Sequence, residues 1–233
     1  MLTREFAMEK LKELVGRKVV EYIQDGMIVG LGSGSTAACA IRSLGERVAQ
    51  GLQIKAISTS YASSRLAQEC GIELVTLEEE PVIDLTFDGA DEVDPRLDLI
   101  KGLGGALLRE KVIASATTRE IILVDYSKMV DRLGTQTPLP VEVVPLAWSL
   151  VQRTFVDRGL KPELRVEKDE PFVTDNGNYI LHCTFPDGID DPAATDRWIN
   201  DIPGVVENGL FVGYTDVVLV GEESGECRTI EKS

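Results

Sequence analysis

The chain has 233 residues, of which 43% are hydrophobic, and its formal net charge is -15. That length is enough for one large core, or for a large domain that carries a smaller one. The negative charge would repel a polyphosphate backbone and leaves no basic stripe, so no nucleic-acid partner is expected. No apolar run reaches the roughly 18 residues of a membrane helix, and the charged N-terminus does not resemble a cleavable signal. We therefore expect no membrane partner and a cytoplasmic location.

The cysteines and the histidine limit the chemistry further. The four cysteines are scattered without a CxxC pair, and buried or inert thiols are the expectation: Cys39, Cys70, Cys183 and Cys227. The only histidine is His182, which leaves no histidine-rich zinc or iron site and no Ser-His-Asp triad elsewhere. We predict no metal and no cofactor.

The first half of the chain alternates short apolar runs with helical patterns, as βαβ units do. Its predicted helices are Glu5–Tyr22, Thr36–Val48, Ala62–Glu69 and Gly105–Ser115. Its predicted strands are Met27–Leu31, Ile54–Ile57, Glu73–Val75, Val82–Phe87 and Glu120–Val124. This order predicts an α/β fold with a Rossmann-like, doubly wound parallel sheet.

After Met129, the proline-rich segment TQTPLPVEVVP begins a second unit. Its predicted strands are Val141–Val144, Glu163–Val166, Phe172–Thr174, Tyr179–Phe185 and Val205–Val212, and its predicted helices are Leu146–Val156 and Pro192–Asn200. The order is close to the ferredoxin-like βαββαβ arrangement. Because the last apolar run, Asp216–Gly221, is expected to return to the first sheet, residues 133–207 are predicted to be an inserted α+β lid domain. Residues 1–132 and 208–233 would form the catalytic domain.

The first candidate site is the glycine-rich turn after strand Met27–Leu31. It reads GLGSGSTA and places Ser33, Gly34, Ser35 and Thr36 at the start of a helix, where N-H groups and hydroxyls can bind a phosphate. A dinucleotide-binding motif requires an acidic residue after the second strand, where this chain has Ser58, Thr59 and Ser60. A single phosphate fits better than NAD, although a turn that binds no ligand would have the same pattern.

Two further segments carry possible acid/base groups. The string DGADEVD puts Asp88 and Asp91 at the end of a buried strand, where it is a catalytic pair, an ordinary acidic loop or, less well, a calcium loop. Glu92 and Asp94 are expected to be solvated loop charges. The segment KGLGGALLREK places Lys101 before the glycines and Glu110 early on the helix that follows, although charges on such a helix usually face solvent.

In the second unit, His182 is expected to be structural. Trp148 and Trp198 are expected to pack in a core or an interface.

Seven segments occur in the order found in A-type ribose-5-phosphate isomerases, and together they span nearly the whole chain. They are GLGSGSTA, STSYAS, TFDGADEVD, KGLGGALLREK, DYSK, PLPVEV and VTDNGN. The chain resembles that family, and the resemblance implies an enzyme that interconverts D-ribose 5-phosphate and D-ribulose 5-phosphate in the non-oxidative pentose phosphate pathway. It also implies a Rossmann-like catalytic domain with a ferredoxin-like lid, and a homodimer or homotetramer.

The resemblance assigns residues as well. The catalytic positions are Glu110, Asp88, Asp91 and Lys101. The substrate-binding positions are Lys12, Ser33, Gly34, Ser35, Thr36, Thr59, Ser60, Gly102, Gly104, Gly105 and Lys128. Leu103 and Tyr61 stand where family members vary, which bears on fine specificity rather than on chemistry.

The chemistry agrees with these residue types, because aldose-ketose isomerisation needs one base that moves a proton between neighbouring carbons through an enediolate. Glu110 has the reach for that base, and Lys101 could stabilise the oxyanion. Two rivals remain open: a sugar-phosphate sensor, which would need no Glu110, and an enzyme that uses CoA or a nucleotide.

Overall fold

The structure, a computed structural model, describes residues 4–232, which form two units. The first unit contains the chain up to Ala90, the segment Arg109–Lys128 and the chain from Tyr214 onward. The second contains Asp91–Leu108 and Met129–Gly213. The last segment of the chain thus rejoins the first unit after the second is complete.

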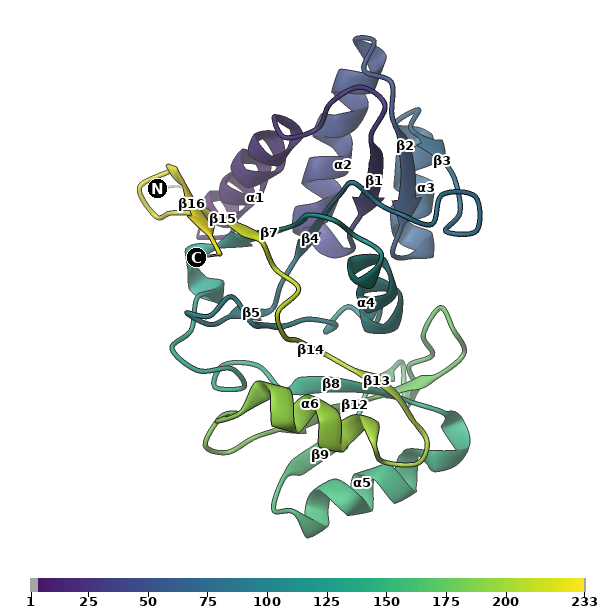
Figure 1. Ribbon diagram of the computed structural model, residues 1–233. Coiled ribbons are helices and arrows are strands. Elements are labelled where there is room, and N and C mark those ends of the chain that lie inside the picture. Colours follow the sequence, from purple (N-terminus) through teal and green to yellow (C-terminus); the bar gives the residue numbers. More distant parts are fainter. Residues whose placement is uncertain (1–3, 233) are drawn as a thin grey trace. The chain divides into compact units, whose positions relative to one another are not determined.

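The first unit is built on a seven-stranded sheet in the order β16-β15-β7-β4-β1-β2-β3 (Figure 1). Its strands are β1 (Ile28–Leu31), β2 (Lys55–Ser58), β3 (Glu73–Leu74), β4 (Leu85–Gly89), β7 (Glu120–Asp125), β15 (Val217–Gly221) and β16 (Cys227–Glu231). Every pairing is parallel except that of β16 with β15. The predicted α/β fold with a mostly parallel sheet is confirmed, and so is the return of the last apolar run, which pairs as β15 with β7.

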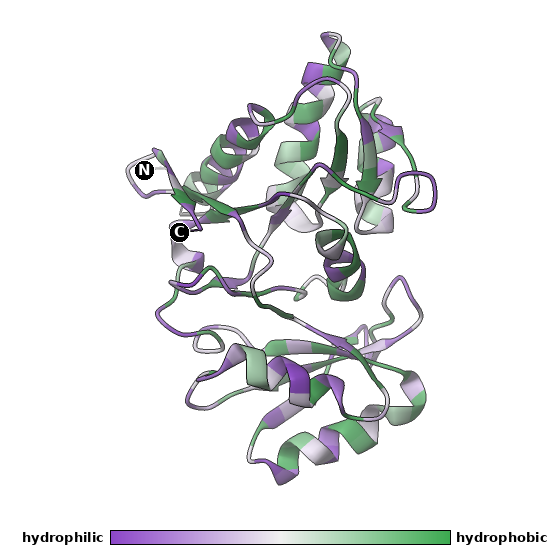
Figure 2. Ribbon diagram, in the orientation of Figure 1, coloured by the Kyte–Doolittle hydropathy of each residue, from purple (hydrophilic) through white to green (hydrophobic). Residues whose placement is uncertain are grey.

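Helices cover both faces of this sheet. The helices α1 (Arg4–Val20), α2 (Gly34–Ala49) and α3 (Tyr61–Glu69) pack on one face, over inward residues such as Val29 and Phe87. The opposite face carries α4 (Leu107–Ser115), whose Ile113 packs against Ile57 and Ile83. The strands of this sheet are mostly hydrophobic, whereas the helices carry both hydrophobic and hydrophilic residues (Figure 2). This is the pattern expected when both faces of a sheet are covered by helices.

The second unit contains a four-stranded antiparallel sheet in the order β13-β8-β12-β9. Its strands are β8 (Leu139–Val143), β9 (Lys161–Leu164), β12 (Tyr179–Thr184) and β13 (Val205–Asn208). A short 3-10 turn (Pro145–Ala147) leads into α5 (Trp148–Asp157), and α6 (Pro192–Asn200) starts at the cap residue Asp191. Both tryptophans pack against the core of this unit, and Trp198 meets Phe155 edge to face at 5.5 Å. Their predicted packing role is confirmed.

Two small sheets complete the second unit. One has the order β14-β6-β5, with β5 (Glu92–Val93), β6 (Leu99–Ile100) and β14 (Leu210–Phe211). The other is a hairpin of β10 (Val166–Glu167) and β11 (Glu170–Pro171).

Two predicted strands differ from the structure, and several short strands were not predicted. The predicted strand Val205–Val212 is two strands in different sheets, separated by Gly209, where a side chain would come within 2.3 Å of the Lys101 carbonyl oxygen. The prediction of a strand at Phe172–Thr174 is wrong, because pairing ends at Pro171. The strands β5, β6, β11 and β16 were missed, since the first three contain only two residues each and the fourth lacks an apolar run.

Candidate active site

In the first unit, the direction of strand addition reverses at β1. The strands β2 and β3 lie on one side of β1, and β4, β7 and β15 lie on the other. Open α/β sheets hold ligands at such a switch point, outside the carboxyl ends of the strands. Here β1 leads into Gly32 and Ser33, while β4 ends at Asp88 and Gly89. Two of the predicted site segments therefore meet where a ligand is expected.

The Asp88 carboxylate is fixed against the glycine turn. Its Oδ1 accepts the backbone N-H groups of Ser33, at 2.9 Å, and Gly89, at 2.7 Å, and the residue is only 2% exposed. A Cβ on Gly32 would lie 2.2 Å from Asp88 Oδ1, so glycine is required for this close approach. The turn and the carboxylate form one rigid arrangement.

The N-terminus of α2 has the features of an anion site. Ser33 is the N-cap residue but makes no side-chain capping bond, and the first turn contains no acidic residue. Gly34, with φ = +88°, and Ser35 are exposed, while Thr36 is partly buried. Backbone N-H groups of a first turn have no partner within the helix, and the helix dipole adds positive potential there. This end of α2 can hold a phosphate.

Thr59 and Ser60 make hydrogen bonds next to the glycine-rich turn. The buried Thr59 hydroxyl donates to the Leu31 carbonyl oxygen at 3.1 Å, so the Ser33 hydroxyl, 2.7 Å away, donates to Thr59. Ser60 caps α3 by accepting the N-H of Ser63 at 3.1 Å. Both residues are committed to internal hydrogen bonds that define the shape of the loop.

Two predicted lysines lie on other elements of the first unit. Lys12 is on α1 and forms an ion pair with Glu9 at 3.4 Å. Lys128 ends the 3-10 turn Tyr126–Lys128 that follows β7, at the same edge of the sheet as Asp88. Neither has a bonding partner on the α2 turn among the residues that the structure describes.

Glu110 lies in the first turn of α4 and is 6% exposed. Residues three apart share a helix side, so it lies on the same side as Ile113, which packs on the sheet. The neighbouring Arg109 donates to the Tyr61 hydroxyl at 3.1 Å and lies 4.4 Å over its ring. Because Tyr61 begins α3, directly after the carboxyl end of β2, the first turn of α4 lies at the predicted edge of the sheet.

In the second unit, the three-stranded sheet carries Asp91 and Lys101. Asp91 directly precedes β5 and donates its N-H to the Ile100 carbonyl oxygen at 2.8 Å, whereas Lys101 directly follows β6. Lys101 is 2% exposed, and its ammonium lies 5.4 Å over the ring of Phe211. The sheet brings these two predicted catalytic residues to adjacent strands.

The glycine loop after Lys101 has a defined conformation. Gly105 donates its N-H to the Gly102 carbonyl oxygen at 2.9 Å, and both have positive φ, +90° and +98°. Asp91 Oδ2 accepts the N-H of Leu103 at 3.0 Å. The Asp91 carboxylate thus holds the loop that the sequence predicts to bind substrate.

Comparison with known proteins adds independent evidence. The family of ribose 5-phosphate isomerase A (phosphoriboisomerase A) matches residues 55–225. Ribose-5-phosphate isomerase A of Gloeobacter violaceus is 50% identical over 219 residues, which cover 94% of this chain and 95% of that protein. The chain belongs to the ribose 5-phosphate isomerase A family.

Solved structures of this family have the same fold. Ribose 5-phosphate isomerase A from Methanocaldococcus jannaschii is 42% identical, with a TM-score of 0.91 over 96% of this chain and 99% of that one. A D-ribose-5-phosphate isomerase in complex with phospho-erythronic acid is also 42% identical, with a TM-score of 0.93 over 96% and 99% of the two chains. The isomerase from Plasmodium falciparum has a TM-score of 0.94 at 35% identity, over 97% of this chain and 100% of that one.

The sequence-based interpretation of Glu92 and Asp94 as solvated charges is wrong. Glu92 is fully buried and accepts backbone N-H groups of Gly134, Gln136 and Thr137 at 2.6, 2.7 and 2.5 Å. Asp94 is 5% exposed and accepts two backbone N-H groups of its own turn. The hydrogen-bond donors to Glu92 lie more than forty positions away in the sequence, so its burial could not be predicted from a local pattern.

Sequence reasoning passed over Arg165, which follows β9. Its Nη1 donates to the Leu103 carbonyl oxygen at 2.9 Å, so it contacts the glycine loop directly. Burial of His182, helped by Arg165 and opposed by Asp91 and Glu163, lowers the pKa of the imidazole from its usual value. No local motif marks Arg165, because its role depends on a contact with a segment about sixty residues earlier in the chain.

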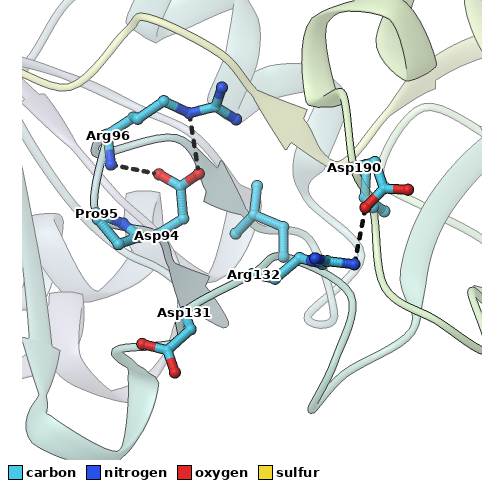
Figure 3. Close-up of a pocket in the computed structure, with 8 residues that line it drawn as sticks. Asp94, Pro95, Arg96, Asp131, Arg132 and Asp190 are labelled. Carbon is cyan, nitrogen blue, oxygen red and sulfur yellow. Dashed lines mark hydrogen bonds and ion pairs between the residues drawn. The ribbon is translucent and has the colours of Figure 1, made fainter.

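A surface hollow of about 270 Å³ lies elsewhere in the second unit (Figure 3). Arg96 pairs there with Asp94 at 3.5 Å, and Arg132 pairs with Asp190 at 2.7 Å. None of the predicted site residues lines it, and its cations are already paired. It is not the candidate active site.

No group of three or more His, Cys, Asp or Glu side chains in residues 4–232 could hold a metal ion. Within the same range, no helix has both the length and the apolar character to cross a membrane.

Proposed function

We propose that this chain interconverts D-ribose 5-phosphate and D-ribulose 5-phosphate, with Glu110 as the base that moves the proton between C1 and C2. The isomerase activity follows from membership of the family. The assignment of individual residues is our proposal. The observation that carries it is the placement of the α2 turn, Asp88 and the first turn of α4 at one edge of the sheet.

The substrate phosphate would bind at the N-terminus of α2, through backbone N-H groups and the hydroxyls of Ser35 and Thr36. Gly34 there has the open backbone that a close ligand needs. Lys12 and Lys128 would add positive charge, which an acidic protein with a net charge of -15 needs near an anion. The relative that binds phospho-erythronic acid supports a phosphorylated sugar-like ligand.

At the reacting end, Glu110 would remove a proton next to the carbonyl and return it to the neighbouring carbon. Lys101 would stabilise the enediolate oxygen, and the glycine loop would contribute backbone donors. Asp88 and Asp91 would move protons among hydroxyl oxygens and also hold the two loops in place. The remote phosphate fixes the sugar, so that binding energy orients the carbon against the base.

The finer structural assignments are part of this proposal. We infer a Rossmann-like catalytic domain, residues 1–132 and 208–233, and a ferredoxin-like lid, residues 133–207, because the sheet orders fit these arrangements. A homodimer or homotetramer and a cytoplasmic location are proposed from the family resemblance and the metabolic role.

The test is Glu110→Gln, which keeps the size of the side chain but removes the proton acceptor. General-base catalysis contributes about 10²- to 10⁴-fold, so we expect kcat to fall by at least about 10²-fold. A coupled assay for ribulose 5-phosphate measures the rate, and calorimetry with phospho-erythronic acid measures binding, which should persist. Glu46→Gln on the exposed part of α2 is the matched control and should leave kcat unchanged.

Two outcomes would contradict the proposal in different ways. An inactive wild type that binds sugar phosphates would favour a sensor. A Glu110→Gln enzyme with near-normal kcat would move the base to Asp88 or Asp91.

A further inference from the structure

The backbone of Leu103 is held by two side chains from different parts of the second unit, Asp91 on its N-H and Arg165 on its carbonyl oxygen. Asp91 Oδ2 accepts the Leu103 N-H at 3.0 Å, and Arg165 Nη1 donates to the Leu103 carbonyl oxygen at 2.9 Å. Both polar groups of one backbone residue are therefore fixed by charged partners, which give stronger hydrogen bonds than neutral ones.

Arg165 is itself rigidly held. Its guanidinium lies 3.6 Å from the centre of the Phe172 ring and pairs with Glu167 at 2.6 Å, and its side chain is only 18% exposed. Its backbone N-H donates to the Ile180 carbonyl oxygen, and its carbonyl oxygen accepts the N-H of Phe172, both at 2.9 Å. Stacking and a planar fork of donors leave the guanidinium little freedom to turn.

The packing of Gly105 confirms that the loop and this cation are closely fitted. A Cβ on Gly105 would lie 2.4 Å from a Phe172 ring carbon and 3.1 Å from Arg165 Nη1. The residue also has φ = +90°, which an L side chain rarely adopts. The loop can approach Arg165 because glycine stands there.

The contact has a directional consequence. In a trans peptide, the carbonyl and the following N-H point in opposite directions. Since the Leu103 carbonyl points at Arg165, the N-H of Gly104 points away from it. Gly104 is exposed, and a Cβ there would meet nothing within 4 Å in the described part of the chain, so there is open space beside this residue.

We propose that Arg165 is a positioning residue for the isomerase, which orients the Leu103–Gly104 peptide so that the Gly104 N-H can donate to a substrate oxygen. The inference rests on the proposed function, in which the loop after Lys101 meets the reacting end of the sugar. Arg165 itself does not touch the substrate. It acts through one peptide plane.

Arg165→Met is the test variant, because it keeps an apolar stem against Phe172 while removing the donor to Leu103. A misplacement of about 1 Å at a reacting group can cost about 10²-fold, so we expect kcat to fall by about 10- to 100-fold. KM should change by less than about threefold, since the phosphate grip at α2 is untouched. Arg165→Lys restores one donor and should recover part of the loss.

Arg158→Met is the matched control, because Arg158 also stacks on an aromatic ring, that of Trp198 at 4.2 Å, and has no contact with the loop. Added methylguanidinium should raise kcat of an Arg165→Ala enzyme and leave Arg158→Met unaffected. The thermal midpoint of each variant shows whether it is folded. If Arg165→Met folds and retains kcat within twofold, or if Arg158→Met loses as much, the inference is overturned. An inactive wild type would instead refute the proposed function.

Discussion

At the scale of single residues, the structural role of a carboxylate in this chain depends on which backbone N-H groups its oxygens accept. Asp88, Asp91 and Glu92 stand close together in one acidic string, yet each accepts different backbone N-H groups. Asp88 supports the α2 turn, Asp91 supports the glycine loop, and Glu92 supports residues 134–137. Because an ionised carboxylate only accepts hydrogen bonds, backbone donors suit it without any metal.

His182 gives a prediction at the scale of one group. Burial is the main cause that lowers its pKa from 6.5; Arg165 acts in the same direction, while Asp91 and Glu163 oppose it. Between the lowered value and 6.5, the unfolded chain binds more protons than the folded one, so this group destabilises the fold as pH falls through that window. Because it is the only histidine, one imidazole NMR titration measures the value.

The result expected is a pKa below 6.5, with His182→Asn removing the corresponding decline in stability toward acid pH. A value at or above 6.5 would show that the two carboxylates outweigh burial and Arg165.

At the scale of elements, the N-terminus of α2 is the part most clearly prepared for an anion. The capping hydroxyl of Ser33 is bonded to Thr59 instead of to the helix, so the N-H groups of the first turn stay available. The first turn itself contains no acidic side chain. The turn is fixed by Asp88 before any ligand arrives, which lowers the entropy lost on binding.

Replacing Ser35 and Thr36 together by alanine tests this element. The two hydroxyls lie remote from the carbon that loses its proton, so we expect kcat/KM to fall by about 10-fold or more, mainly through KM. Steady-state kinetics with ribose 5-phosphate provides the measurement. Free ribose should be a poor substrate of the wild type. Equal use of ribose and its phosphate would remove the anion site.

At the scale of the whole molecule, the supply of possible metal ligands bears on whether activity depends on a metal. The chain has one histidine, and one oxygen of Asp88 already accepts two backbone N-H groups. One Asp91 oxygen accepts the Leu103 N-H. We therefore expect the isomerase rate to stay within about twofold after exhaustive chelation, because proton transfer by a carboxylate needs no ion. Loss of activity that magnesium, manganese or zinc restores would make Asp88 and Asp91 ligands.

Much of the fold, and the segments that form the candidate site, could be predicted from the sequence, because both depend on local patterns. Apolar runs of period two or 3.6 predicted the parallel sheet and its helices, and the helix Pro192–Asn200 was correct to the residue, since Asp191 and Pro192 start it. Glycines followed by hydroxyl residues predicted the turn after β1. Such signals are encoded by neighbouring residues.

Only the tertiary structure decided the rest, because the deciding contacts join distant segments. Gly209 breaks one predicted strand into two, since its backbone must pass close to the carbonyl of Lys101. Glu92 can be buried because its carboxylate accepts N-H groups from residues 134–137. Arg165 contacts the glycine loop because its guanidinium donates to the Leu103 carbonyl oxygen. From the sequence alone, a charged side chain is predicted to face solvent, because burying it without a hydrogen-bonding partner costs too much free energy. Only the tertiary structure shows that such a partner is present.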